Sequence, residues 1–391
     1  MTPFAERVLT LESEGAYAVL ARSQALEAQG HEIMHLEIGQ PDFATPAHVS
    51  AAGIKAIQSG QTRYNPPAGV PALRQLIARE AGRQHGLEVT PSQVVIGPGA
   101  KPGLFFPTMA LVQAGDEVIY PDPGFPTYKA MIAIAGGVPV AVPLREENKF
   151  SFDLKAFDSA INRRTRLIVL NSPANPTGGV IPLEDLQHIA AKAQEFGAWV
   201  MSDEIYGRLA YDGNLVPSIA SLPGMQESTI IVDGFSKTYA MTGWRLGYTI
   251  MPKELAERVE LLLTHSVGCT ATFTQFAGME ALTGPQEQVD AMVTEYQRRR
   301  DHIVAGLNAI PGIHCLVPQG AFYVFPNVKS FGRPSSEIAR RLLDEAGVAA
   351  LSGTDFGPNG EGYLRLCYAT SVRTIDGALE KMAEFFQGLS A

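Results

Sequence analysis

The chain carries several short apolar runs rich in β-branched residues, separated by stretches whose apolar residues recur at helical spacing. The runs favour buried strands, and Leu183–Phe196, with its apolar side chains on one helical face, favours a helix between two of them. Strands that alternate with helices predict a mainly parallel sheet covered on both faces, as in the α/β class. The expected strands are Gln93–Ile96, Glu117–Tyr120, Leu167–Leu170, Ala198–Met201 and Thr229–Val232.

The pattern changes after Gln286, where a long polar helix is followed by two isolated apolar segments. Gly320–Phe325 and Tyr363–Tyr368 favour strands with helices between them, which predicts a smaller α+β domain. The N-terminal residues favour a helix followed by an extended segment that packs with this C-terminal part. We predict an N-terminal arm with part of the small domain (1–44), a large domain (45–285) and a C-terminal small domain (286–391).

Composition and charge narrow the class of protein. A chain of 391 residues with 46% hydrophobic and 18% charged residues is typical of a folded globular protein with more than one domain. Its net charge of −9, without a long basic tract, argues against a nucleic-acid partner. No segment approaches the ~18 consecutive apolar residues of a membrane helix, and the charged N-terminus does not fit a signal peptide. We therefore expect a cytoplasmic protein without a membrane partner.

The cysteines give no sign of a disulfide framework or a metal site. Cys269, Cys315 and Cys367 are widely separated and form no Cys-x-x-Cys pair. This usage is typical of reduced, mostly buried thiols. We expect no bound metal.

Small and polar residues follow the first predicted strand, and ligands of open α/β sheets bind beyond the carboxyl ends of strands. After Ile96 comes the turn Gly97–Gly103, with Gly99, Ala100 and Lys101 at its centre. Free N–H groups at a helix N-terminus suit a phosphate, although the spacing matches neither the Walker A nor the Gly-x-Gly-x-x-Gly pattern. A plain strand-to-helix turn is the alternative.

Two later strand ends carry side chains that suit a polar ligand. Asn171–Gly179 contains Asn175 and two Asn-turn-Pro units, and Asp203 and Tyr206 follow Met201. The alternatives are a tight turn built from good turn formers and a helix N-cap by Asp203.

Lys237 and Arg245 lie in a polar turn after the last of these strands, Thr229–Val232. An amine is a better nucleophile when it is desolvated or near another cation, and Arg245 also offers a planar fork for a phosphate. Four strand ends thus supply a carboxylate, a phenol with an amide, a phosphate turn and an amine. A phosphorylated pyridine aldehyde needs this set, so we predict pyridoxal 5'-phosphate as the cofactor.

These motifs closely resemble those of class I, fold-type I pyridoxal-phosphate-dependent aminotransferases, especially the aspartate-aminotransferase-like subgroup. The resemblance covers essentially the whole chain, and its specific motifs are Asn171–Gly178, Ser202–Tyr206 and Ser236–Arg245. It implies a large domain with a mainly parallel seven-stranded sheet between helices, a smaller α+β domain, and a homodimer.

The resemblance also implies a role for each site residue. Lys237 would form the aldimine with the cofactor and then move the proton between the substrate α-carbon and the cofactor carbon. Asp203 would keep the pyridine nitrogen protonated, while Asn175 and Tyr206 would donate to the phenolate oxygen. Phe125 would stack on the ring, with an ordinary core aromatic residue as the alternative.

Phosphate binding would differ from that of many family members. They often carry a serine or threonine in the glycine turn, and Gly234 stands where the first serine of a Ser-x-Ser-Lys segment often is. Backbone groups of the turn would therefore do more of the binding. The implied phosphate-binding residues are Gly99, Ala100, Lys101, Ser236, Arg245 and, from the neighbouring subunit, Tyr64.

Arg365 interrupts an alternating apolar strand, where an unpaired guanidinium would be costly. The resemblance supplies a bidentate partner in the α-carboxylate of an amino acid substrate, which Gly39 and Asn175 would also approach. Tyr17 lies where family members line the side-chain pocket. No residue plainly binds a second carboxylate, so aspartate, aromatic and other neutral L-amino acids stay open as donors.

The expected function is transfer of an amino group from an L-amino acid to a 2-oxo acid such as 2-oxoglutarate, in a ping-pong cycle through Lys237. The alternative is a carbon–sulfur β-lyase or a related lyase on the same fold. That enzyme would keep Lys237, Asp203 and Arg365 but would release a keto acid and ammonia from the amino acid alone.

Overall fold

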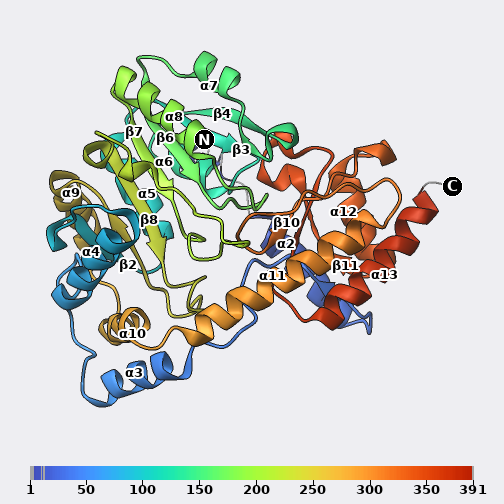
Figure 1. Ribbon diagram of the computed structural model, residues 1–391, viewed down its shortest axis with the longest axis horizontal. Coiled ribbons are helices and arrows are strands. Elements are labelled where there is room, and N and C mark those ends of the chain that lie inside the picture. Colours follow the sequence, from blue (N-terminus) through green and yellow to red (C-terminus); the bar gives the residue numbers. More distant parts are fainter. Residues whose placement is uncertain (1–3, 10, 12–13, 390–391) are drawn as a thin grey trace.

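A central sheet organises the protein, whose computed structural model describes residues 4–9, 11 and 14–389. Within these residues the sheet has eight strands in the order β2-β9-β8-β7-β6-β3-β4-β5 (Figure 1). The strands are β2 (Val94–Gly97), β3 (Glu117–Asp122), β4 (Val138–Arg145), β5 (Ser151–Phe152), β6 (Thr165–Asn171), β7 (Trp199–Asp203), β8 (Thr229–Gly234) and β9 (Gly247–Ile250).

The sheet confirms the mainly parallel arrangement and has one strand more than expected. Neighbours from β4 through β3, β6 and β7 to β8 are parallel, whereas β9 is antiparallel to both β8 and β2. The additional strand is β5, which pairs antiparallel with β4 through only two residues. All five strands expected from the sequence are present. A strand of two residues is too short to show a periodic pattern of apolar residues, so the sequence could not reveal β5.

Helices cover both faces of the sheet. Along β6, Ile168 and Leu170 face one group of buried residues, while Leu167 and Val169 face another, as the pleat requires. The first face packs against α7 and α8, and the second packs against α5, α6 and α9. Their bounds are α5 (Lys101–Leu111), α6 (Thr127–Ile134), α7 (Leu154–Ala160), α8 (Leu183–Phe196) and α9 (Lys253–Thr264), so the helix expected at Leu183–Phe196 is confirmed.

Three further helices complete this part of the molecule. A third group of buried residues joins β2, β8 and β9 to α3, α4 and α10. In Figure 1 these three helices lie on the left of the molecule, with α10 and α3 below α4. Their bounds are α3 (Ala47–Gln58), α4 (Pro71–His85) and α10 (Thr272–Thr283).

The C-terminal part is a separate α+β arrangement. One small sheet has the order β10-β13-β12, and a second pairs β1 with β11 in parallel. Through β1, Met34 and His35 pair with Val348 and Ala349 of the C-terminal part. The elements are α2 (Gly15–Glu27), β1 (Met34–His35), α11 (Glu287–Asn308), β10 (Tyr323–Val324), α12 (Ser335–Ala346), β11 (Val348–Ala349), β12 (Leu351–Ser352), β13 (Leu364–Cys367) and α13 (Val372–Leu389).

The expected strand at Gly320–Phe325 is mostly irregular, because only Tyr323 and Val324 pair with β13. Ala321 has a φ of 57°, in the left-handed region, and so ends the extended conformation before Tyr323. The strand expected at Tyr363–Tyr368 is confirmed as β13.

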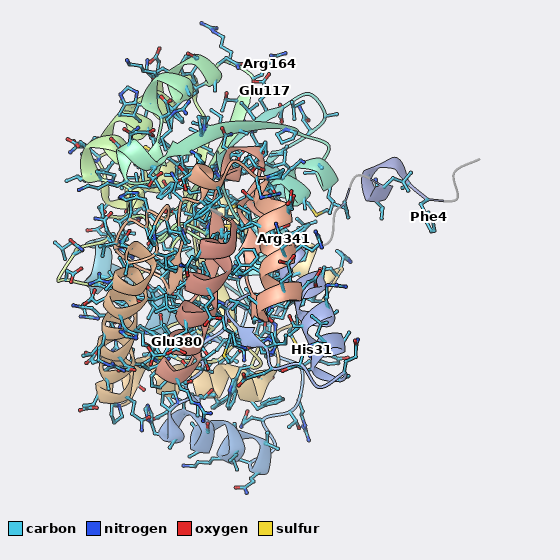
Figure 2. The ribbon with its side chains drawn as sticks, turned by 90° about the vertical axis from the view of Figure 1, so that its right-hand side faces the viewer. Phe4, His31, Glu117, Arg164, Arg341 and Glu380 are labelled. Carbon is cyan, nitrogen blue, oxygen red and sulfur yellow. The ribbon has the colours of Figure 1, made fainter. Side chains whose placement is uncertain are left out.

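Figure 2 shows α12 with Arg341 and α13 with Glu380 side by side on the C-terminal part. The short helix α1 (Glu6–Leu9), next to Phe4, lies at the edge of the molecule in Figure 2 and contacts α6. The long helix α11 is tied to other segments by ion pairs of Arg299 with Asp42 and of Arg300 with Asp212. These two arginines are buried, so this part of α11 packs inside the molecule although its sequence is polar.

Candidate active site

Lys237 lies in the turn after β8 and is half-buried, and its side chain reaches the segment of Gly39 and the rings of Tyr206 and Phe322. Its Nζ donates a hydrogen bond to the Gly39 carbonyl oxygen at 2.6 Å. The nitrogen also lies 5.7 Å from the ring centroid of Tyr206 and 5.5 Å from that of Phe322. Burial lowers the pKa of Lys237 to about 8, and the nearby Arg365 guanidinium adds to the shift. A larger fraction of this amine is therefore neutral near pH 7 than of an exposed lysine.

Asp203 ends β7, and its carboxylate has two hydrogen-bond donors. Tyr128 donates from its hydroxyl to Oδ2 at 2.7 Å, and the Ile205 N–H donates to Oδ1 at 3.3 Å. A turn rather than a helix follows Asp203, so the N-cap alternative does not hold. Burial raises the pKa of Asp203 to about 6. Sequence reasoning missed Tyr128, although it lies one helical turn beyond Phe125.

Tyr206 and Asn175 lie next to these groups. The Tyr206 and Tyr323 hydroxyls share a hydrogen bond of 2.7 Å. The Asn175 N–H donates to Asn171 Oδ1 at 2.8 Å, which fixes the turn after β6, and its Oδ1 accepts from Arg365 Nη1 at 3.4 Å. Tyr323 and Asn171 were not among the expected site residues. Nothing in the local pattern around Tyr323 distinguishes it from a core aromatic residue.

The Gly97–Gly103 turn forms a tight backbone cradle with Arg245. Gly99 has a φ of 92°, and a Cβ there would lie 2.3 Å from Arg245 Nη2. Ala100 caps α5, so the N-terminus of this helix opens beside the arginine. Arg245 donates to the carbonyl oxygens of Thr242 at 2.9 Å and Pro98 at 3.3 Å. Ser236 is buried in the turn before Lys237. Cationic and N–H donors therefore gather where an anion can bind.

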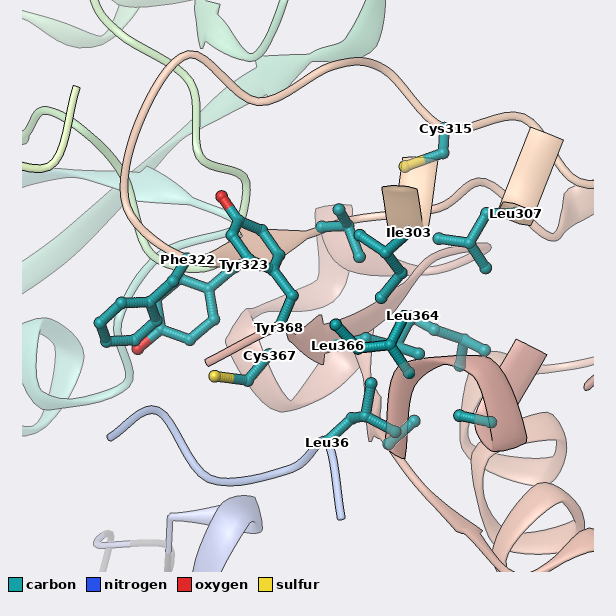
Figure 3. Packing of buried hydrophobic residues seen from close by; sticks show 14 of the residues in the cluster. Leu36, Ile303, Leu307, Cys315, Phe322, Tyr323, Leu364, Leu366, Cys367 and Tyr368 are labelled. Atoms are coloured by element: carbon teal, nitrogen blue, oxygen red, sulfur yellow. The ribbon is translucent and has the colours of Figure 1, made fainter. Parts of the chain in front are cut away.

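Arg365 lies on β13 and is 4% exposed. Its Nη2 donates to the Glu37 carbonyl oxygen, and its guanidinium carbon lies 4.7 Å from the Tyr323 ring centroid. Within the described part of the chain, its Nε has no hydrogen-bond partner. A buried guanidinium with an unused donor suits a carboxylate ligand. Figure 3 shows Tyr323 and Cys367, from the paired strands β10 and β13, at the edge of the C-terminal core.

Lys101 turns its side chain away from the Arg245 cradle. Its Nζ forms an ion pair with Glu14 and lies 5.3 Å from the Phe125 ring centroid. Phe125 packs edge-on against Tyr128 with 5.8 Å between ring centroids. Tyr17, one helical turn after Glu14, is on α2 and is 65% exposed. The start of α2 therefore lies beside the ring of Phe125.

Tyr64 lies outside this cluster and is 97% exposed. The neighbouring Asn65 anchors the segment, because its side chain donates to the Thr270 carbonyl oxygen at 2.8 Å and to Thr272 Oγ1 at 2.9 Å. The structure thus brings Gly39, Asp203, Tyr206 and Arg365 close to Lys237. Of the other expected residues, Tyr64 faces outward and Tyr17 is mostly exposed on α2.

Comparison with known proteins decides the family. Residues 31–382 match the family described as aminotransferase class I and II. This chain belongs to that family. It is 38% identical to an aspartate aminotransferase of Geobacillus stearothermophilus, with 98% of each chain covered. It is also 38% identical to aromatic-amino-acid aminotransferase 2 of Thermococcus litoralis, covering 91% of this chain and 92% of the relative.

A solved structure agrees with these matches. The aspartate aminotransferase of Thermus thermophilus with maleate superposes with a TM-score of 0.93 at 40% identity, covering 98% of this chain and 100% of that one. The chain is therefore a class I aminotransferase of the aspartate-aminotransferase-like type, an enzyme that transfers amino groups with pyridoxal 5'-phosphate. No observation favours the lyase alternative.

The residues present fit this cofactor. A buried carboxylate, a desolvated amine and an arginine at a helix N-terminus match its ring nitrogen, aldehyde and phosphate. The buried Arg365 Nε still has no hydrogen-bond partner among the described residues. Among the described residues, no cluster of three or more His, Cys, Asp or Glu side chains could hold a metal ion. None of the described helices is long and apolar enough to cross a membrane.

Proposed function

We propose that Lys237 is the residue that binds the cofactor aldehyde and moves the proton during amino transfer. The observation that carries this proposal is the desolvated Lys237 amine, which donates to the Gly39 carbonyl oxygen and lies close enough to the Arg365 guanidinium for that charge to lower its pKa. When bound, the cofactor supplies a ring that withdraws electrons from the substrate α-carbon. Lys237 can then take the α-proton, because a neutral amine with a lowered pKa acts as a base near neutral pH.

We propose the remaining roles from the same geometry. Asp203 would hold the ring nitrogen in its protonated form, with Tyr128 keeping the carboxylate oriented. Asn175 and Tyr206 would donate to the phenolate oxygen, and Phe125 would cover one face of the ring. The phosphate would be held by Gly99, Ala100, the Lys101 backbone, Ser236 and Arg245, and the substrate α-carboxylate by Arg365 with Gly39 and Asn175.

We propose that two copies of the chain complete each site, with Tyr64 of one subunit reaching the phosphate of the other. The 97% exposure of Tyr64, on a segment anchored through Asn65, supports this proposal. We also propose a large domain (45–285), a small domain (286–391) and an arm with part of the small domain (1–44). The separate sheets and the pairing of β1 with β11 support that division. The expected compartment is the cytoplasm.

The donor is proposed to be an L-amino acid with either an acidic or an aromatic side chain, and the acceptor a 2-oxo acid such as 2-oxoglutarate. The names of the relatives include both substrate classes. The Lys101 ammonium beside Phe125 is paired with Glu14, so an incoming second carboxylate can replace Glu14, whereas a neutral aromatic side chain leaves the ion pair intact. Tyr17 on the same helix would line this pocket.

A donor panel tests the proposed function. The purified protein is expected to show the visible absorption of the bound cofactor and to transfer amino groups from aspartate or aromatic amino acids to 2-oxoglutarate. Lys237→Ala should lose both the visible absorption of the bound cofactor and turnover. Lys192→Ala is the matched control, because Lys192 is a surface lysine paired with Glu195. Ammonia release from the amino acid alone would support a lyase instead. Full transfer activity in Lys237→Ala would refute the role of this lysine.

A further inference from the structure

Tyr323 contacts three parts of the site that the proposed mechanism treats separately. Its hydroxyl lies 2.7 Å from that of Tyr206, and its ring centroid lies 4.7 Å from the Arg365 guanidinium carbon. It also lies against Gly39, because a Cβ on that glycine would come within 2.0 Å of the Tyr323 hydroxyl oxygen. The side chain is 1% exposed, so water does not compete for these contacts.

The backbone before Tyr323 is held firmly enough to position its hydroxyl. Ala321 adopts a φ of 57°, in the left-handed region that residues with a Cβ rarely occupy. Its N–H donates to the Leu209 carbonyl oxygen at 2.8 Å, and its own carbonyl oxygen accepts from the hydroxyls of Tyr211 and Tyr368. Two residues later, Tyr323 pairs with Cys367 across β10 and β13. Because hydrogen bonds hold the backbone at Ala321 and strand pairing holds it at Tyr323, the Tyr323 ring has little freedom to move.

The direction of the hydrogen bond between the two tyrosines follows from counting protons. Each hydroxyl has one proton to donate and can also accept. If Tyr206 donates to the cofactor phenolate oxygen, its own proton is used, so the bond between the tyrosines requires Tyr323 to donate to Tyr206. A hydroxyl that accepts a hydrogen bond becomes a stronger donor, because hydrogen bonds in a chain polarise one another.

We propose that Tyr323 is a positioning residue that orients the Tyr206 hydroxyl and strengthens its hydrogen bond to the phenolate oxygen of the cofactor. This inference rests on the proposed role of Tyr206. The charged and titratable groups around the pair are Arg365 and Cys367 on β13 and Lys237 after β8. Of these, Arg365 also contacts the Tyr323 ring, so Tyr323 touches both the residue that would donate to the phenolate oxygen and the residue that would bind the carboxylate.

The variant Tyr323→Phe removes the hydroxyl but keeps the ring beside Arg365. The measurement is a pH titration of the visible absorption of the cofactor-bound protein, which reports the pKa of the nitrogen joining Lys237 to the cofactor. A stronger donor to the phenolate lowers this pKa, so losing Tyr323 as a donor should raise it by about half a unit. The dissociation constant of a non-reactive dicarboxylate, measured below this pKa, should stay near that of the parent protein.

Tyr363→Phe is the matched control. Tyr363 is also a buried tyrosine, but its hydroxyl donates to Glu146 at 2.8 Å, away from the Tyr206–Tyr323 pair. The absorption pKa of this variant should equal that of the parent protein. Thermal unfolding of both variants would establish that they are folded to the same extent.

A double-variant cycle separates this inference from the proposed role of Tyr206. Tyr206→Phe should raise the pKa by about 1–2 units, and adding Tyr323→Phe to it should cause no further shift. An unchanged pKa in Tyr206→Phe would refute the proposed role of Tyr206. A shift in Tyr206→Phe with none in Tyr323→Phe, or an equal Tyr323 effect in both backgrounds, would refute the inference while leaving the Tyr206 role intact.

Discussion

The Lys237 ammonium nitrogen donates a hydrogen bond of 2.6 Å to the backbone carbonyl oxygen of Gly39, across a sequence separation of 198 residues. The bond joins the turn after β8 to the extended segment that follows β1. Arg365 donates to the Glu37 carbonyl oxygen in the same segment. The residue proposed to bind the cofactor and the residue proposed to bind the substrate are therefore hydrogen-bonded to the same stretch of backbone.

The lowered pKa of Lys237 predicts how the cofactor-free protein takes up its cofactor. Only the neutral amine attacks an aldehyde, and burial lowers the pKa of this lysine from 10.5 to about 8. The uptake rate should therefore rise with pH and level off above about 8. Stopped-flow absorbance measures this rate. A rate that keeps rising towards pH 10 would show that the amine titrates like an exposed lysine.

Asp203 should make the stability of the cofactor-free protein depend on pH. Burial raises the pKa of Asp203 from 3.8 to about 6, so the folded state favours the protonated carboxyl. Its contribution to the free energy of unfolding is complete below pH 3.8 and is lost as pH rises through 6. Asp203→Asn should thus stabilise the cofactor-free protein at pH 8 by up to about 3 kcal/mol, and not at acid pH. Denaturant unfolding at both pH values measures the difference.

Asp233→Asn is the control for that variant. Burial raises the pKa of Asp233 to about 7, and its Oδ2 accepts from the Tyr248 hydroxyl at 2.8 Å. Both variants should gain stability at pH 8, but only Asp203→Asn should bind the cofactor weakly. Equal cofactor affinity in the two variants would contradict the role proposed for Asp203.

Gly39→Ala should disturb the site through Tyr323. The added methyl group would overlap the Tyr323 hydroxyl, so either that ring or the Gly39 segment must move. We expect kcat/KM to fall by about 10–100-fold, a transition-state loss of about 1.4–2.8 kcal/mol. Adding Tyr323→Phe removes the overlapping oxygen and should recover part of the activity. No recovery in the double variant would show that the two residues act independently.

Hybrid dimers test whether Tyr64 completes the site of a second subunit. Tyr64→Ala should weaken cofactor binding, and Lys237→Ala should be inactive. Mixed after mild dissociation, the two variants should form hybrids in which an intact Lys237 receives an intact Tyr64 from the partner. Activity above that of either variant alone is the expected result. Activity that stays at the sum of the two parents would indicate that each chain completes its own site.

Much of the fold was accessible from the sequence because its evidence is local. The runs around Ile96, Leu170, Met201 and Val232 are apolar and short, and each is followed by a glycine turn or by polar side chains. Parallel strands bring their carboxyl ends to one edge of a sheet, so those groups could be placed together without coordinates. The irregular Ala321 and the two-residue β5 were missed because both depend on tertiary contacts rather than on periodicity.

The sequence by itself determined the class of chemistry, since Lys237, Asp203, Asn175 and Arg365 stand at positions that local pattern alone makes unusual. Only the tertiary structure decided how they are supported. Tyr128 reaches Asp203 across 75 residues and Tyr323 reaches Tyr206 across 117, and both tyrosines look like ordinary core residues in the sequence. The physical reason is that a buried hydroxyl acquires its partner from chain packing, which brings together segments that no local pattern connects.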